Sequence, residues 1–137
     1  MIFIDSGFLY AYVNKREILH EEVKLKMKEV LSGKYGSILV SNFIVDETLT
    51  LARARTKKCN VGNQIQKFIK KRVNGNPIIT TLIIDSSSMD LIDKKYDLFC
   101  EKGLSYTDCS ILALMESQNI SFLATTAKEF EGIVTVI

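Results

Sequence analysis

Short apolar runs rich in β-branched residues alternate along the chain with longer stretches in which apolar residues recur three or four positions apart. The short runs predict buried strands, and the longer stretches predict amphipathic helices. The predicted strands cover residues 2–4, 37–40, 78–84, 121–125 and 133–137. The predicted helices cover residues 8–13, 17–31, 43–55, 61–73, 89–100 and 105–117. Regular alternation of this kind is typical of βαβ units.

The length of the chain and the absence of any linker or internal repeat indicate a single domain that spans residues 1–137. Parallel strands joined by helices are covered on both faces, so we expect an α/β fold. The predicted architecture is a three-layer α/β/α sandwich around a mostly parallel sheet of about five strands. Hydrophobic residues make up 47% of the chain, which is enough for a substantial core.

Polar residues mark several boundaries between these elements. Ser41 or Asn42 is placed to cap the helix that follows, and the serines at 86–88 are placed to cap another. The Gly-Asn-Pro sequence at 75–77 indicates a break between the preceding helix and the following strand. His20 lies in a polar stretch and is predicted to be a surface or capping residue.

The sequence lacks the residues that several common kinds of site require. The cysteines at 59, 100 and 109 are odd in number and form no Cys-x-x-Cys pair, so we interpret them as reduced thiols of a cytoplasmic protein, with Cys109 in the core. No signal sequence or membrane-spanning apolar run is evident, and no membrane partner is expected. A single histidine disfavours a zinc site, and no nucleophile elbow, phosphate loop or dinucleotide fingerprint occurs.

Three acids lie where the apolar pattern predicts burial. Asp5 directly follows the first strand, where ligands of open α/β sheets bind. Glu47 shares a predicted helical stripe with Phe43, Leu51 and Ala54. Asp108 precedes an apolar stripe of Ile111, Leu112 and Met115, although a helix cap is an alternative because it lies in a first helical turn. The neighbouring Asp46 is interpreted as solvated.

Each of the three acids follows a different predicted strand, so they are expected to meet at one edge of the sheet. Carboxylates in such a group repel one another unless a cation joins them. Oxygen ligands alone favour Mg²⁺ or Mn²⁺ over zinc. The sequence therefore predicts an acidic metal site built from Asp5, Glu47 and Asp108.

Over essentially its whole length the chain resembles the PIN-domain family, most closely the VapC-type toxins of prokaryotic toxin–antitoxin pairs. The opening sequence 4–9 is similar to the first family motif, with Asp5 as its acid. The sequence 43–49 is similar to the second motif, with Glu47 as its acid. The sequence 103–111 is similar to the third and is the most specific of them, with Asp108 as its acid.

The fourth motif of the family departs from its usual pattern here. The family often has an aspartate three residues before a phenylalanine, and Ala127 stands in that place before Phe130. Thr125, Thr126 or Glu129 would substitute only in part. The departure favours a one-metal or weakened site over a two-metal site.

The resemblance implies an endoribonuclease in which Asp5, Glu47 and Asp108 hold Mg²⁺ or Mn²⁺ and hydrolyse phosphodiester bonds of single-stranded or loop RNA. It also implies a homodimer and a small antitoxin partner that fills the cleft. Accessory roles near the acids are assigned to a further set of residues, namely Ser6, Thr107, Thr125, Ala127 and Glu129.

The distribution of basic residues along the chain bears on RNA binding. The net charge is only +2 and the pI is about 8.4, so an anionic partner is permitted and not required. Basic residues nevertheless gather at Arg53, Arg55, Lys57 and Lys58, and again at Lys67, Lys70, Lys71 and Arg72. Alone they indicate a solvated helix face, but beside a phosphate-cleaving site the first group is expected to bind RNA.

Two other functions fit parts of the pattern. A catalytically weak or inactive PIN domain that binds RNA or protein is favoured by Ala127 and disfavoured by the three retained acids. A receiver-like domain with a phosphorylatable aspartate requires an acidic pair after the first strand, and Asp5 stands alone there. Metal-dependent RNA cleavage distinguishes the ribonuclease from the inactive PIN domain. Formation of an acyl phosphate would select the receiver-like domain.

Overall fold

Five strands form one sheet in the computed structural model, which describes residues 1–137. They are β1 (Ile2–Ile4), β2 (Ile38–Ser41), β5 (Ile79–Leu82), β6 (Phe122–Ala124) and β7 (Thr135–Val136). Their order across the sheet is β5-β2-β1-β6-β7, and every neighbouring pair is parallel. The predicted parallel sheet is therefore confirmed.

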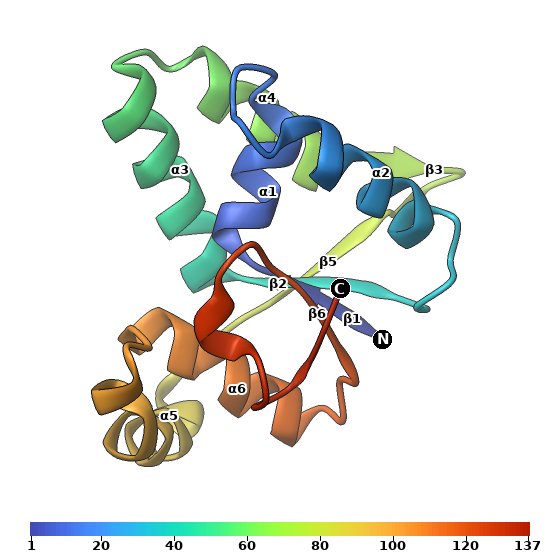
Figure 1. Cartoon of the computed structure of the whole chain (residues 1–137). Helices are drawn as coiled ribbons and strands as arrows, with labels where there is room; N and C mark the ends of the chain where they lie inside the picture. The colour runs from blue at the N-terminus through green and yellow to red at the C-terminus, as the bar shows by residue number, and fades with distance from the viewer.

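Six α-helices cover the two faces of this sheet. They are α1 (Ser6–Val13), α2 (His20–Leu31), α3 (Asn42–Thr56), α4 (Asn60–Ile69), α5 (Ser86–Phe99) and α6 (Tyr106–Ser117). Figure 1 shows α1 to α4 on one side of the strands and α5 and α6 on the other. Helix α1 packs against α2, α3 and α4, whereas α5 packs against α6. This arrangement confirms the predicted three-layer sandwich.

The hydrophobic core lies between the sheet and its helices. All three residues of β1 have no exposed surface, because this central strand is covered on both faces. Cys109 is also fully buried, as the sequence predicts. None of the helices combines the length and the apolar character needed to cross a membrane.

Two helix starts show which polar residue acts as the cap. Ser41 caps α3, because its hydroxyl accepts a hydrogen bond from the backbone N–H of Ile44 at 3.2 Å, as predicted. The prediction that serines 86–88 cap α5 is wrong. Asp85 takes that role by accepting from the Ser87 N–H at 3.0 Å, and the serines form the first turn of the helix.

The helix predicted over residues 61–73 ends earlier, at Ile69. The chain then forms a two-stranded antiparallel hairpin from β3 (Arg72–Val73) and β4 (Asn76–Pro77). Asn74 and Gly75 join these strands with φ angles of 51° and 80°. An Asn-Gly pair with two positive φ angles favours a tight hairpin turn, so the local turn chemistry overrides the helical pattern.

The helix predicted from residue 17 begins instead at His20. Of the two alternatives for His20, the surface position is wrong, since the residue is buried, and the capping role is borne out, since its Nδ1 lies 2.8 Å from the backbone oxygen of Ala11. That oxygen belongs to the last turn of α1, where carbonyls lack helical partners. The imidazole thus closes the end of α1, and Ile18, expected on a buried helical face, is 94% exposed in the preceding loop.

Candidate active site

The acidic site lies at the ends of β1 and β6, where the order of the strands across the sheet switches from one side of β1 to the other. The chain leaves β1 towards β2 on one side and returns from α6 to β6 on the other. Ligands of open α/β sheets bind at such switch points, beyond the carboxyl ends of the strands. Asp5 follows β1 directly, and its N–H donates to the Ala124 carbonyl at 2.9 Å, which ties it to the end of β6.

Asp5 is held from both sides. Its side chain is 4% exposed. As the N-cap of α1, it accepts a hydrogen bond at Oδ1 from the Ser6 N–H at 2.6 Å. Its other oxygen, Oδ2, accepts from the Thr125 hydroxyl at 2.8 Å, and the Ala127 N–H donates to that hydroxyl at 3.0 Å. The segment after β6 therefore fixes the orientation of the Asp5 carboxylate.

Ser6 joins Asp5 to Glu47, which lies 41 residues away along the chain. The Ser6 Oγ donates to Glu47 Oε2 at 2.5 Å and lies 3.3 Å from Asp5 Oδ1. Ser6 is the first residue of α1 and Glu47 lies in the N-terminal half of α3, and these helices directly follow β1 and β2. Two of the predicted acids are thus brought together through a buried hydroxyl.

The predicted helical stripe around Glu47 is displaced by one residue. Ile44, Thr48 and Ala52 are the buried positions of α3, and Ala54, expected on the buried face, is exposed. Glu47 is half-buried and borders this face, so its carboxylate reaches the edge of the site. Asp46 is exposed, as predicted.

Asp108 lies in the first turn of α6 and forms a capping box. Its Oδ2 accepts from the Ser105 N–H at 2.7 Å, and its own N–H donates to Ser105 Oγ at 3.1 Å. The helix-cap alternative considered for Asp108 is therefore confirmed. It does not remove this acid from the site, because its charge acts on Asp5.

The electrostatics of the site centre on Asp5. Burial raises the pKa of Asp5 from its ordinary value of 3.8 to about 6. The hydrogen bonds from Thr125 and Ser6 lower that pKa, whereas repulsion by Asp108 and Glu47 raises it. Asp5 is therefore destabilised as an anion by both of the other acids, and none of the ion pairs in the structure provides the three acids with a cationic partner.

The donors at this edge of the sheet fit a hard divalent cation in their chemistry. They are carboxylate and hydroxyl oxygens, which Mg²⁺ and Mn²⁺ prefer. As they stand, however, no three acidic, histidine or cysteine side chains are grouped closely enough to hold a metal ion. The Glu47 and Asp108 carboxylates instead accept hydrogen bonds from Ser6 and Ser105.

The predicted accessory residues differ in their surroundings. Ser6 and Thr125 are buried and bond directly to the acids. Ala127 is half-buried and packs partly against the core. Glu129 is exposed beside Gly103, and Thr107 is half-buried. Sequence reasoning gave these residues no separate roles, because nothing in the sequence shows which hydroxyl meets which carboxylate.

Thr126 lies close to Asp5 because Gly7 has no side chain. A Cβ atom on Gly7 would lie 2.8 Å from the Thr126 hydroxyl and 3.8 Å from Asp5 Oδ2. Real Cβ contacts are not that short, so the glycine leaves room for Thr126 beside Asp5. Nothing in the sequence pattern pointed to Gly7 as the residue that makes this approach possible.

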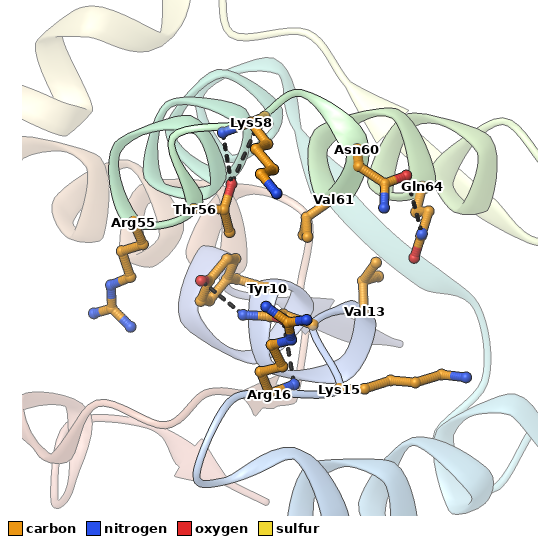
Figure 2. Close-up of a pocket in the computed structure, with 11 residues that line it drawn as sticks. Tyr10, Val13, Lys15, Arg16, Arg55, Thr56, Lys58, Asn60, Val61 and Gln64 are labelled. Carbon is orange, nitrogen blue, oxygen red and sulfur yellow. Dashed lines mark hydrogen bonds between the residues drawn. The ribbon is translucent and has the colours of Figure 1, made fainter.

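Only two of the four basic residues predicted to bind RNA line a cavity in the structure. Arg55 and Lys58 line an open cavity of about 560 Å³, whereas Arg53 and Lys57 do not (Figure 2). Lys15 and Arg16 also line it, and the sequence pattern did not connect them with the helix that carries Arg55. All four predicted residues are exposed.

Comparisons with known proteins agree with this fold. The PIN domain family model matches residues 2–134. A VapC ribonuclease from Archaeoglobus fulgidus is 26% identical over 121 residues, which cover 88% of this chain and 74% of that protein.

Two solved structures share the fold. VapC20 of Mycobacterium tuberculosis, a toxin that cleaves the sarcin–ricin loop, superposes with a TM-score of 0.74 at 18% identity and covers 97% of this chain and 95% of its own. VapBC2 of Rickettsia felis, bound to a DNA fragment from its promoter, gives 0.69 at 15% identity, over 100% and 98%. With its family-model match, parallel sheet and VapC-like neighbours, the chain belongs to the PIN-domain family.

Proposed function

We propose that this protein is a metal-dependent endoribonuclease and the toxin of a VapC-type toxin–antitoxin pair. The observation that carries the proposal is the hydrogen-bonded link from Asp5 through Ser6 to Glu47 at the switch point of a PIN-domain sheet, with Asp108 near enough to raise the pKa of Asp5. The similar protein from Archaeoglobus fulgidus is a ribonuclease, which supports the reaction class.

The three carboxylates are the residues that would hold Mg²⁺ or Mn²⁺. Such an ion lowers the pKa of bound water and stabilises charge on the attacked phosphate. Ser6 positions Glu47 by donating to its Oε2, and Thr125 positions Asp5 by donating to its Oδ2. Burial of Asp5 keeps bulk water from this carboxylate, which strengthens every electrostatic interaction that it makes.

The substrate that we propose is single-stranded or loop RNA, whose bases are accessible to a protein. A small antitoxin protein, a homodimeric assembly and a cytoplasmic location complete the proposal. VapC20, a toxin that cleaves the sarcin–ricin loop, supports the RNA substrate, and VapBC2 supports the antitoxin partner.

The alternative is a PIN domain that binds RNA or protein with weak or no catalysis. Ala127 favours it, because the side chain at this position supplies no fourth carboxylate and packs partly against the core. Three acids remain, so a single-metal site is the form of the enzyme that we favour over loss of activity.

We expect purified protein to cleave an unpaired RNA in Mg²⁺ or Mn²⁺ and to leave the same sequence intact when it is annealed to its complement. Chelation with EDTA should abolish cleavage, because no other group at the site activates water. Gel analysis of an end-labelled RNA measures both effects. RNA binding without cleavage at saturating Mn²⁺ would select the alternative function.

Ala127→Asp should raise Mn²⁺ affinity and increase cleavage at saturating Mn²⁺, with slightly lower stability of the metal-free protein. The added carboxylate supplies an oxygen ligand, but it also adds charge to a group that already repels itself. Calorimetric titration with Mn²⁺ compares the variant with the unchanged protein, and Ala127→Asn serves as the matched control, because it adds a side chain of the same size without the charge. Equal Mn²⁺ affinities would place residue 127 outside the site.

A further inference from the structure

The open cavity of about 560 Å³ lies apart from the acids, between the end of α1 and the segment that joins α3 to α4 (Figure 2). Four of its lining residues are cationic, namely Lys15, Arg16, Arg55 and Lys58, and none is acidic. Its volume falls within the range of about 300–1,000 Å³ that is usual for small-ligand sites. A cavity of this charge favours an anionic ligand.

The cavity and the acidic group share two helices. Tyr10 lies one turn after Ser6 in α1, which is about 6 Å along the helix axis. Arg55 lies two turns after Glu47 in α3, which is about 12 Å along its axis. The same two helices therefore connect the acids to the cavity.

The chemistry inside the cavity suits more than a phosphate. Figure 2 shows Val13 and Val61 at its wall beside the amides of Asn60 and Gln64. The Gln64 Nε2 donates to Asn60 Oδ1 at 3.4 Å, so Gln64 Oε1 and Asn60 Nδ2 are left to face a ligand. Amide side chains pair with base edges, and apolar walls accept the faces of bases.

Arg55, one of the cations that line the cavity, is itself held in place. The Arg55 guanidinium lies 5.4 Å from the centre of the Tyr10 ring and 3.4 Å from the Glu17 carboxylate. The Tyr10 hydroxyl in turn accepts from Asn14 Nδ2 at 2.8 Å. These contacts reduce the flexibility that Arg55 would lose on binding a phosphate.

We propose that this cavity binds one unpaired nucleotide of the RNA, at a distance from the bond that is cut. The base lies between Val13 and Val61 with its edge on Asn60 and Gln64, and the adjoining phosphates lie on Arg55 and Lys58. The proposal rests on the proposed function for the identity of the ligand. An acidic peptide would satisfy the cations but would leave the amide pair and the apolar wall without a planar partner.

The phosphate contacts are tested by binding in EDTA, where no cleavage occurs. Fluorescence anisotropy follows a labelled single-stranded RNA at several salt concentrations. The double variant Arg55→Ala/Lys58→Ala should weaken binding about tenfold and reduce the slope of log K against log salt by about 1.4, since each phosphate contact on a single strand contributes about 0.7. Lys67→Ala/Lys71→Ala is the matched control, because it removes the same charge from exposed positions outside the cavity. Equal losses in the two double variants would overturn the proposal.

The base contact is tested with small ligands. A nucleoside monophosphate should bind the unchanged protein at least about tenfold more tightly than ribose 5-phosphate, and Asn60→Ala/Gln64→Ala should remove that preference. Calorimetry measures both affinities. Equal binding of the two ligands would overturn the proposal, as would tighter binding of a glutamate-rich peptide that shows the same loss in Arg55→Ala/Lys58→Ala. RNA that binds in EDTA as expected but is never cleaved with Mn²⁺ would count against the proposed function and leave the cavity assignment standing.

Discussion

Replacement of Asp5 by asparagine should reduce RNA cleavage at least about 100-fold while the protein stays folded. The change removes the most buried charge of the site, and loss of groups that merely orient a metal ligand already costs about 10–100-fold. Asparagine keeps an oxygen that accepts the Ser6 N–H, so the cap of α1 is retained. Cleavage rates at saturating Mn²⁺ and circular dichroism spectra measure the two parts of this expectation.

The matched control for this variant is Asp46→Asn, which removes a carboxylate from an exposed position beside Glu47. It should cleave RNA at the unchanged rate, because Asp46 lies outside the coupled group. If Asp5→Asn and the unchanged protein cleave at the same rate after removal of contaminating nuclease, Asp5 has no part in the reaction.

The metal-free protein should lose about 3 kcal/mol of stability through Asp5 as the pH rises from about 4 to about 6. The pKa of Asp5 is raised to about 6 in the folded protein, so between its ordinary value of 3.8 and about 6 the folded state holds a proton that the unfolded state has released. Stability therefore falls with rising pH in this window and is flat on either side of it for this group.

Urea unfolding in EDTA at a series of pH values isolates this contribution when the unchanged protein is compared with Asp5→Asn. Other carboxylates titrate in both proteins and cancel in the difference, so the variant should become the more stable of the two by about pH 6 to 7. A difference that stays constant from pH 4 to pH 7 would mean that burial and the neighbouring acids do not act on Asp5 as described.

The sequence predicted the parts of the site that follow from position along a strand or helix. An apolar run that ends in an acid predicted Asp5 at the carboxyl edge of a buried strand, and the structure places it there. The apolar positions after Asp108 predicted a buried helix face, and this face forms. These features depend on residues within a few positions of one another, which is the range over which periodicity is informative.

The remaining features depend on contacts between distant segments. The Ser6–Glu47 and Thr125–Asp5 hydrogen bonds join residues 41 and 120 positions apart, and no local pattern reports such pairs. His20 was misplaced for the same reason, because its partner is the backbone of another helix. The hairpin after α4 was missed because the break was placed at 75–77 and the Asn74-Gly75 pair was not recognised as a hairpin turn.

The central claim is that Asp5, Glu47 and Asp108 form one metal site, and Mn²⁺ binding tests it most directly. Calorimetric titration should show that Asp5→Asn, Glu47→Gln and Asp108→Asn each weaken Mn²⁺ binding at least about tenfold, because each removes a charged oxygen ligand. Asp46→Asn should bind Mn²⁺ as the unchanged protein does. Unchanged Mn²⁺ affinity in Glu47→Gln or Asp108→Asn would contradict the claim, because that acid would then serve only its hydrogen bond to Ser6 or Ser105.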